Sequence, residues 1–147
     1  MTASERLRVM VKPLTPVERA PLERAGIETR LTRRAALGQP SNASTHLRIC
    51  ALTGLDPVTG LKRPPFVAGE LFWPSLGAAL RMRRIEQGDI TLRQAGKQAR
   101  MSYTAIGRIE RAEPVSIDAV LAACRWLGRH PFDFVSPDIS RELGRAA

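Results

Sequence analysis

The pattern of apolar and polar positions divides the chain into two parts of different character. Over residues 75–135, apolar residues recur at the three- and four-residue spacing of amphipathic helices. Before residue 75, prolines and glycines interrupt the pattern, and the stretch 38–44 (GQPSNAS) has the composition of a linker. We therefore predict a helical domain over 75–136, preceded by a largely irregular extension.

Signals for helix starts and stops support this division. Thr91 and Gln94 have the spacing of a capping box, in which each side chain accepts a backbone N–H of the other residue. Ser102 and Ser116 each precede an apolar stripe, and Gly128 follows the last stripe. These signals predict five short helices with tight connections, the last being a short turn or helix at 131–135.

The predicted helix 102–111 has two distinct faces. Ala105, Ile106 and Ile109 share one side, which we expect to be buried. The opposite side is expected to carry Tyr103, Thr104, Gly107, Arg108 and Arg111.

Helices 91–99 and 102–111 are joined by a very short turn. The small residues Ala95, Gly96 and Ala99 stand where the two helices must cross closely. This is the arrangement of a helix-turn-helix motif, whose second helix enters the major groove of DNA.

The sequence resembles a known family over about residues 76–135: the Cro/CI-type (XRE-like, lambda-repressor-like) helix-turn-helix domains. The resemblance is carried by Leu76-Gly77, Leu80, Arg84, Ile90-Thr91, Met101-Ser102, Ile106, Arg108-Ile109-Glu110-Arg111, Pro114-Val115-Ser116 and Trp126-Leu127-Gly128. It implies an all-α, five-helix fold. The chain departs from the family at Leu92, where Gln is common, and at Arg100 and Ala112, where Gly is common.

The resemblance also implies roles for individual residues. The expected base-reading residues lie on the outer face of helix 102–111 and are Tyr103, Thr104, Gly107 and Arg108. The expected phosphate contacts are Thr91, Arg93, Gln94, Lys97, Ser102 and Arg111. Arg84 and Glu110 are expected to form a structural ion pair.

The rest of the chain gives weaker signals. We expect residues 1–45 to be a disordered basic arm, residues 46–74 an accessory segment that packs on or links to the next domain, and residues 137–147 a C-terminal tail. Residues 1–73 could serve as an arm on DNA, as a dimerisation element or as a docking segment for another protein.

Charge and composition limit the function. The formal net charge of +9 favours a polyanionic partner, although the free use of arginine in high-GC genomes would also produce it. The two cysteines do not suggest a disulfide framework, and no segment approaches the length of a signal peptide core or a membrane span. His46 and Cys50 have the spacing of half a metal site, without further ligands nearby. No nucleophile–base pair appears, so we expect no catalytic residues, no metal and no cofactor.

The leading hypothesis is a sequence-specific transcriptional regulator of phage, plasmid or bacterial repressor type, binding double-stranded DNA as a homodimer in the bacterial cytoplasm, at the nucleoid. The alternative is an antitoxin-like or bridging protein whose residues 1–73 bind a protein partner, with the helix-turn-helix used for autoregulation. A third reading is a non-specific nucleic-acid binder.

Overall fold

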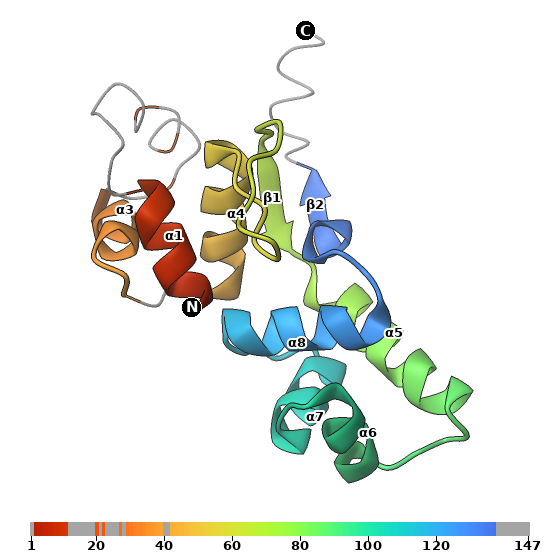
Figure 1. Cartoon of the computed structure of the whole chain (residues 1–147). Helices are drawn as coiled ribbons and strands as arrows, with labels where there is room; N and C mark the ends of the chain where they lie inside the picture. The colour runs from red at the N-terminus through yellow and green to blue at the C-terminus, as the bar shows by residue number, and fades with distance from the viewer. Residues whose placement is uncertain are drawn as a thin grey trace, which may run out of the picture. The chain divides into compact units, whose positions relative to one another are not determined.

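The computed structural model describes residues 2–11, 20, 22, 27, 29–39 and 42–137. The chain divides into two compact units (Figure 1). The N-terminal unit comprises Met1–Glu70 with Val135–Ala147, and the C-terminal unit comprises Leu71–Phe134. The expected tail beyond Pro137 lies outside the described residues.

The C-terminal unit has the predicted all-α architecture. Its elements are the α-helices α5 (Trp73–Glu86), α6 (Leu92–Ala99), α7 (Tyr103–Glu110) and α8 (Ile117–Leu127), followed by the 3-10 helix η1 (Pro131–Phe134). The prediction of five short helices over 75–135 is confirmed. The unit begins four residues earlier than the domain predicted at 75–136, because α5 starts at Trp73 and Phe72 precedes it as N-cap.

The helix boundaries follow from the capping residues. The Thr91 hydroxyl accepts the Gln94 N–H at 3.2 Å, and the Gln94 side-chain oxygen accepts the Thr91 N–H at 2.9 Å. The Ser102 hydroxyl caps α7 by accepting the Thr104 N–H, and the Ser116 hydroxyl caps α8 by accepting the Ala119 N–H. Gly128 ends α8 with left-handed backbone. Each predicted cap therefore satisfies a backbone group that a helix end leaves without an intrahelical partner.

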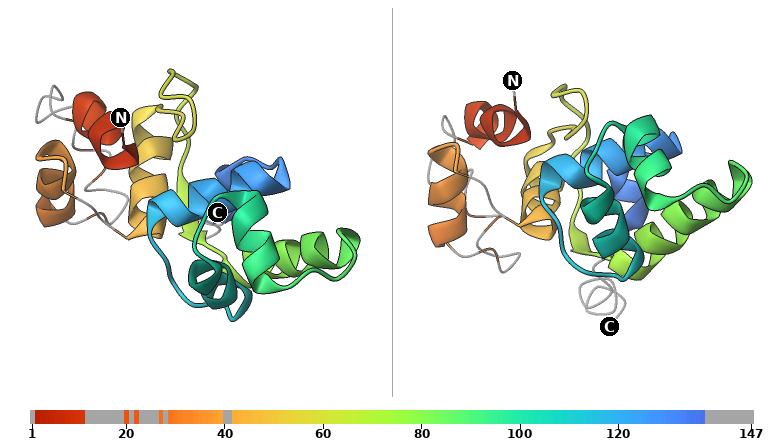
Figure 2. Two further views of the ribbon diagram at one scale, coloured as in Figure 1. Left: turned by 60° about the horizontal axis from the view of Figure 1, so that its bottom comes forward. Right: turned by 90° about the horizontal axis from the view of Figure 1, so that it is seen from below.

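The core of this unit is built from the predicted stripes. Leu76 and Leu80 of α5, Ile106 and Ile109 of α7, and Val120 of α8 are fully buried. Helix α7 packs against both α5 and α6, and α8 packs against the same two helices (Figure 2). The packing holds α7 on its Ile106–Ile109 side and leaves Tyr103, Thr104 and Arg108 exposed.

The N-terminal unit contains more regular structure than the sequence predicts. Its elements are α1 (Ala3–Val11), α3 (Thr29–Ala36), α4 (Ala43–Thr53), and the strand β1 (Ala68–Leu71), which pairs with β2 (Val135–Pro137). Helices α1, α3 and the start of α4 thus lie within the segment 1–45 that is expected to be a disordered arm. Likewise, residues 46–70 of the expected accessory segment 46–74 belong to this unit.

Local caps and a small apolar core explain these helices. The Thr2 hydroxyl accepts the Glu5 N–H at 3.2 Å and the Glu5 carboxylate accepts the Thr2 N–H at 2.6 Å, which is a capping box at the start of α1. Asn42 caps α4 by accepting the Thr45 N–H at 2.8 Å. The buried core includes Leu7, Val11, Leu22, Ile27, Leu47, Ile49 and Cys50.

Candidate nucleic-acid interface

The outer side of α7 presents most of the side chains expected to read bases. Tyr103 is 46 % exposed, and Thr104 and Arg108 are exposed as well. The Ser102 hydroxyl accepts the Thr104 N–H at 3.2 Å, so the cap also fixes the first turn of the helix. The N-terminus of α7 thus combines hydrogen-bonding side chains with the positive end of the helix dipole.

Gly96 determines how closely α6 and α7 approach each other. A Cβ at this position would lie 2.9 Å from the carbonyl oxygen of Met101 and 3.2 Å from the nitrogen of Tyr103. Any side chain here would push the start of α7 away from α6. Arg100 completes the turn in the left-handed conformation, with φ of 55°, and its N–H bonds to the Gly96 carbonyl.

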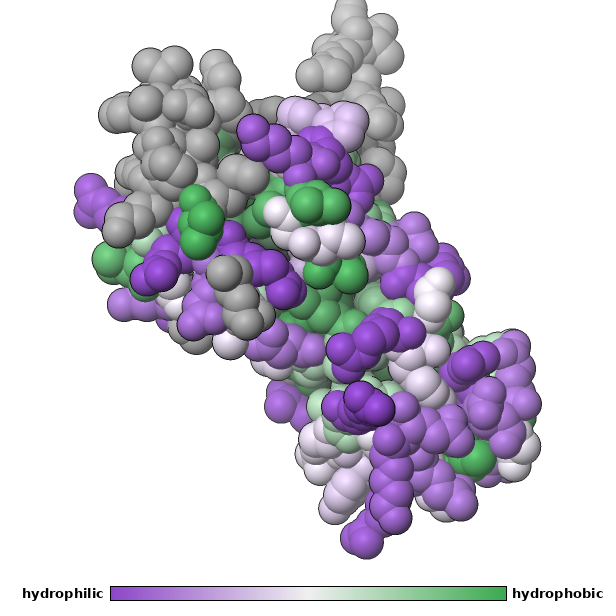
Figure 3. Space-filling view, viewed as in Figure 1, coloured by the Kyte–Doolittle hydropathy of each residue, from purple (hydrophilic) through white to green (hydrophobic). Residues whose placement is uncertain are grey.

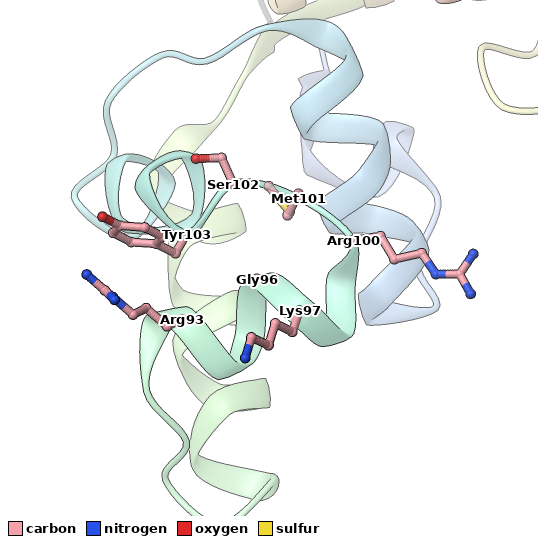
Figure 4. A pocket seen from close by; sticks show the side chains of 7 residues that line it. All are labelled: Arg93, Gly96, Lys97, Arg100, Met101, Ser102 and Tyr103. Carbon is pink, nitrogen blue, oxygen red and sulfur yellow. The ribbon is translucent and has the colours of Figure 1, made fainter.

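A basic cleft lies beside this turn (Figure 4). It is lined by Arg93, Gly96, Lys97, Arg100, Met101, Ser102 and Tyr103. The Arg93 guanidinium stacks over the Tyr103 ring, 5.1 Å from its centroid, whereas Arg100 points away from that pair. Arg93, Lys97 and the N-terminus of α7 surround one opening, and this arrangement is suited to binding a phosphate group.

Thr91 and Gln94 also lie on the exposed side of α6, but they already serve the capping box. The Gln94 oxygen is used as an acceptor, so its NH₂ group is the part that can donate to a ligand. The surface over this part of the unit is largely hydrophilic in the view of Figure 3, as expected for a face that meets a polyanion.

Arg84 and Glu110 form the ion pair that the resemblance implies. Arg84 donates from Nε to Oε2 at 2.8 Å and from Nη2 to Oε1 at 2.7 Å, and its Nη1 donates to the Ile90 carbonyl at 2.9 Å. The Glu110 side chain is only 5 % exposed, and its hydrogen bonds to Arg84 raise the pKa of that guanidinium. The pair connects α5, the loop before α6 and the end of α7, and so fixes the position of α7.

Gly107 does not lie where the sequence predicts. It is buried, and a Cβ built on it would contact Leu92 Cδ1 and Arg111 Nη1, both at 3.4 Å. Leu92 stands where the family often has Gln, and its apolar side chain covers this part of α7. Leu92 of α6 and Arg111 therefore cover Gly107, which does not lie on the exposed side of α7 with the other residues expected to read bases.

Arg108 and Arg111 both turn toward an acid that the sequence analysis missed. Glu113 lies 3.6 Å from Arg108 Nε and accepts from Arg111 Nε at 3.1 Å. Arg108 Nη2 also donates to the Pro114 carbonyl at 2.8 Å. In the sequence, Glu113 follows the two-residue turn at 111–112 directly. It stands five residues after Arg108 and two residues after Arg111.

The cysteine thiols of the described part of the chain are not reactive groups. Cys50 and Cys124 are free and buried, and burial raises the pKa of each thiol to about 12. Both thiols therefore stay protonated at neutral pH and pack as apolar groups. Among the described residues, no three His, Cys, Asp or Glu side chains gather to hold a metal ion, and no helix is long and apolar enough to span a membrane.

Comparison with known proteins identifies the C-terminal unit. A family model described as a helix-turn-helix domain matches residues 75–132, which covers α6, α7 and α8 and nearly all of α5. No curated protein and no solved structure matches the chain. The matched segment, its cap geometry and the α6–turn–α7 crossing agree, and residues 75–132 therefore form a helix-turn-helix DNA-binding domain consistent with the XRE-like type.

Proposed function

We propose that the protein is a sequence-specific transcriptional regulator that places α7 in the major groove of double-stranded DNA. The observation that supports this most strongly is the exposed outer side of α7, where Tyr103, Thr104 and Arg108 can hydrogen-bond to base edges. The groove is about 12 Å wide and accepts a single helix of this kind. The proposed activity is binding, with no catalytic step.

The basic cleft supports the assignment of phosphate contacts. Arg93 and Lys97 project from α6 beside the start of α7, and Ser102 contributes a hydroxyl (Figure 4). Half or more of the hydrogen bonds in a protein–DNA interface go to phosphates and sugars, which fix the register of the recognition helix. In this proposal Arg93 takes over the role that Gln has in the family at the position of Leu92.

The proposed regulator acts as a homodimer on a two-fold symmetric site. Two copies of α7 would then meet half-sites about 34 Å apart, one helical turn of DNA. Repression would follow if such a site overlaps a promoter.

The test is selection of bound duplexes from random DNA at physiological salt, followed by variants of the full chain. Arg93→Ala should weaken binding to selected and random DNA alike and reduce the salt slope by about 0.9. Thr104→Ala should instead cost about 1–3 kcal/mol on the selected site and relax the preference at one base pair. Arg125→Ala, which removes an exposed charge from α8, is the matched control. Selection that enriches no motif would contradict sequence-specific binding.

A second function is favoured by the N-terminal unit, which has its own helices and buried core. A folded unit of this kind suits a protein partner better than a disordered arm does. In an antitoxin-like or bridging protein, residues 1–73 would bind that partner and the helix-turn-helix would serve autoregulation. Co-purification of the full chain with the product of a neighbouring gene would support this function, and failure of every neighbour to co-purify would count against it.

A further inference from the structure

The Glu113 carboxylate contacts the guanidinium groups of Arg108 and Arg111 at the end of α7. Its two carboxylate oxygens accept from Arg111 Nε at 3.1 Å and Nη2 at 3.4 Å, the forked arrangement with which a guanidinium also binds phosphate. The same carboxylate lies 3.6 Å from Arg108 Nε. One acid thus engages two of the three arginines that the sequence assigns to DNA, Arg108 and Arg111.

The backbone, as well as the side chain, places Glu113 there. Ala112 adopts a left-handed conformation with φ of 58°, which folds the chain back over the end of α7. The Ala112 N–H bonds to the Ile109 carbonyl and the Glu113 N–H bonds to the Arg108 carbonyl, both at 2.9 Å. The turn therefore holds the carboxylate close to the two guanidinium groups.

Because these ion pairs are exposed to solvent, they are weak enough for another anion to replace the Glu113 carboxylate. Side chains of Arg108, Arg111 and Glu113 are each close to half exposed or more, and ion pairs in such positions contribute little to stability. The hydrogen bond to Arg111 lowers the pKa of Glu113, so the carboxylate stays ionised throughout the neutral range. An incoming phosphate must compete with a permanent negative charge for the same donors.

We propose that Glu113 is an internal counter-anion that withholds Arg108 and Arg111 from DNA until a site offers enough contacts to displace it. The inference rests on the proposed function, since it assumes that α7 binds DNA. Random DNA lacks a matched base in the correct register for Arg108, so its contacts with these arginines are mainly to phosphates and have to overcome Glu113. A cognate site adds a base contact for Arg108, which outcompetes the carboxylate. Glu113 therefore raises the ratio of specific to non-specific affinity.

The test compares Glu113→Gln with Glu86→Gln in the full chain. Both changes remove one exposed negative charge, but Glu86 lies at the end of α5. Binding is measured against a random-sequence duplex and against a duplex selected by the wild type, over a series of salt concentrations. Glu113→Gln should bind random DNA roughly three- to tenfold more tightly than Glu86→Gln, with a salt slope steeper by up to about 0.9, and its specificity ratio should fall.

Two results would overturn the inference, and they differ from failure of the proposed function. If both variants bind random DNA equally, the effect of Glu113 is only that of net charge. If Glu113→Gln binds the selected duplex and random DNA more weakly, the carboxylate positions the arginines for DNA instead of withholding them. If the wild type binds no duplex at all, the proposed function itself fails.

Discussion

Left-handed backbone positions distinguish the two units of the molecule. In the described part of the N-terminal unit, the residues with positive φ are the glycines Gly38, Gly54 and Gly60. In the described part of the C-terminal unit, two glycines have positive φ, and so do three residues with side chains. These are Asp89, Arg100 and Ala112, with φ values of 58°, 55° and 58°. A left-handed conformation costs a residue with a Cβ about 1–2 kcal/mol, so the C-terminal unit carries backbone strain that the other unit avoids.

The strained residues border the candidate interface. Asp89 stands before α6, Arg100 joins α6 to α7, and Ala112 follows α7. Two of them have a direct link to the proposed function, since Arg100 lines the basic cleft and Ala112 directs Glu113 back to the arginines. A strained backbone conformation persists only where the surrounding structure holds it in place. In this unit, the buried core and the Arg84–Glu110 pair hold the helices on either side of the strained residues.

The largest effects should come from the cores, and they test whether the two units are independent. Leu47 in α4 and Leu80 in α5 are both fully buried, so each change to alanine should cost about 2–5 kcal/mol. Both tryptophans, Trp73 and Trp126, lie in the C-terminal unit, so their fluorescence reports the unfolding of that unit. In urea, Leu80→Ala should shift the fluorescence transition, whereas Leu47→Ala should shift only part of the far-UV circular dichroism transition. A single transition moved equally by both changes would show that the units unfold as one.

The next largest effect should come from Glu110→Ala. It leaves the Arg84 guanidinium, with a side chain only 20 % exposed, without its carboxylate, at a cost of about 2–3 kcal/mol. The loss should appear in the fluorescence transition, and DNA affinity should fall because α7 loses its anchor to α5. Glu86→Ala removes an equal charge from an exposed site and should change stability by less than about 0.5 kcal/mol. Equal stability of both variants would remove the structural role of the pair.

The sequence predicts the C-terminal unit well because its signals are local. Thr91, Ser102, Ser116 and Gly128 mark helix ends through contacts within a few residues, and the stripes around Ile106 and Val120 are periodic. The N-terminal unit carries similar local signals, which the prediction of an irregular extension does not take into account. Thr2 and Glu5 have the spacing of a capping box, and the linker-like stretch 38–44 contains the Asn42 cap of α4.

Other features could not be predicted because they depend on contacts between distant segments. Strand β1 pairs with β2 across more than sixty residues of sequence, and no local pattern marks either strand. Within the candidate site, the burial of Gly107 depends on Leu92 of another helix. The contact of Glu113 with both arginines depends on the left-handed turn at Ala112, where helical periodicity carries no information.

The smallest effects test the strain itself, through opposite substitutions in the two units. Ala112→Gly should stabilise the C-terminal unit by about 0.5–1 kcal/mol, because the relief of left-handed strain exceeds the added freedom of the unfolded chain. Gly54→Ala should destabilise the N-terminal unit by about 1–2 kcal/mol, because φ is 74° there and the new Cβ would lie 2.8 Å from the Arg63 carbonyl oxygen. Fluorescence and circular dichroism in urea separate the two. A loss of stability in Ala112→Gly would mean that the turn at Ala112 is not strained. The backbone conformation that brings Glu113 close to Arg108 and Arg111 would then not lower the free energy of unfolding.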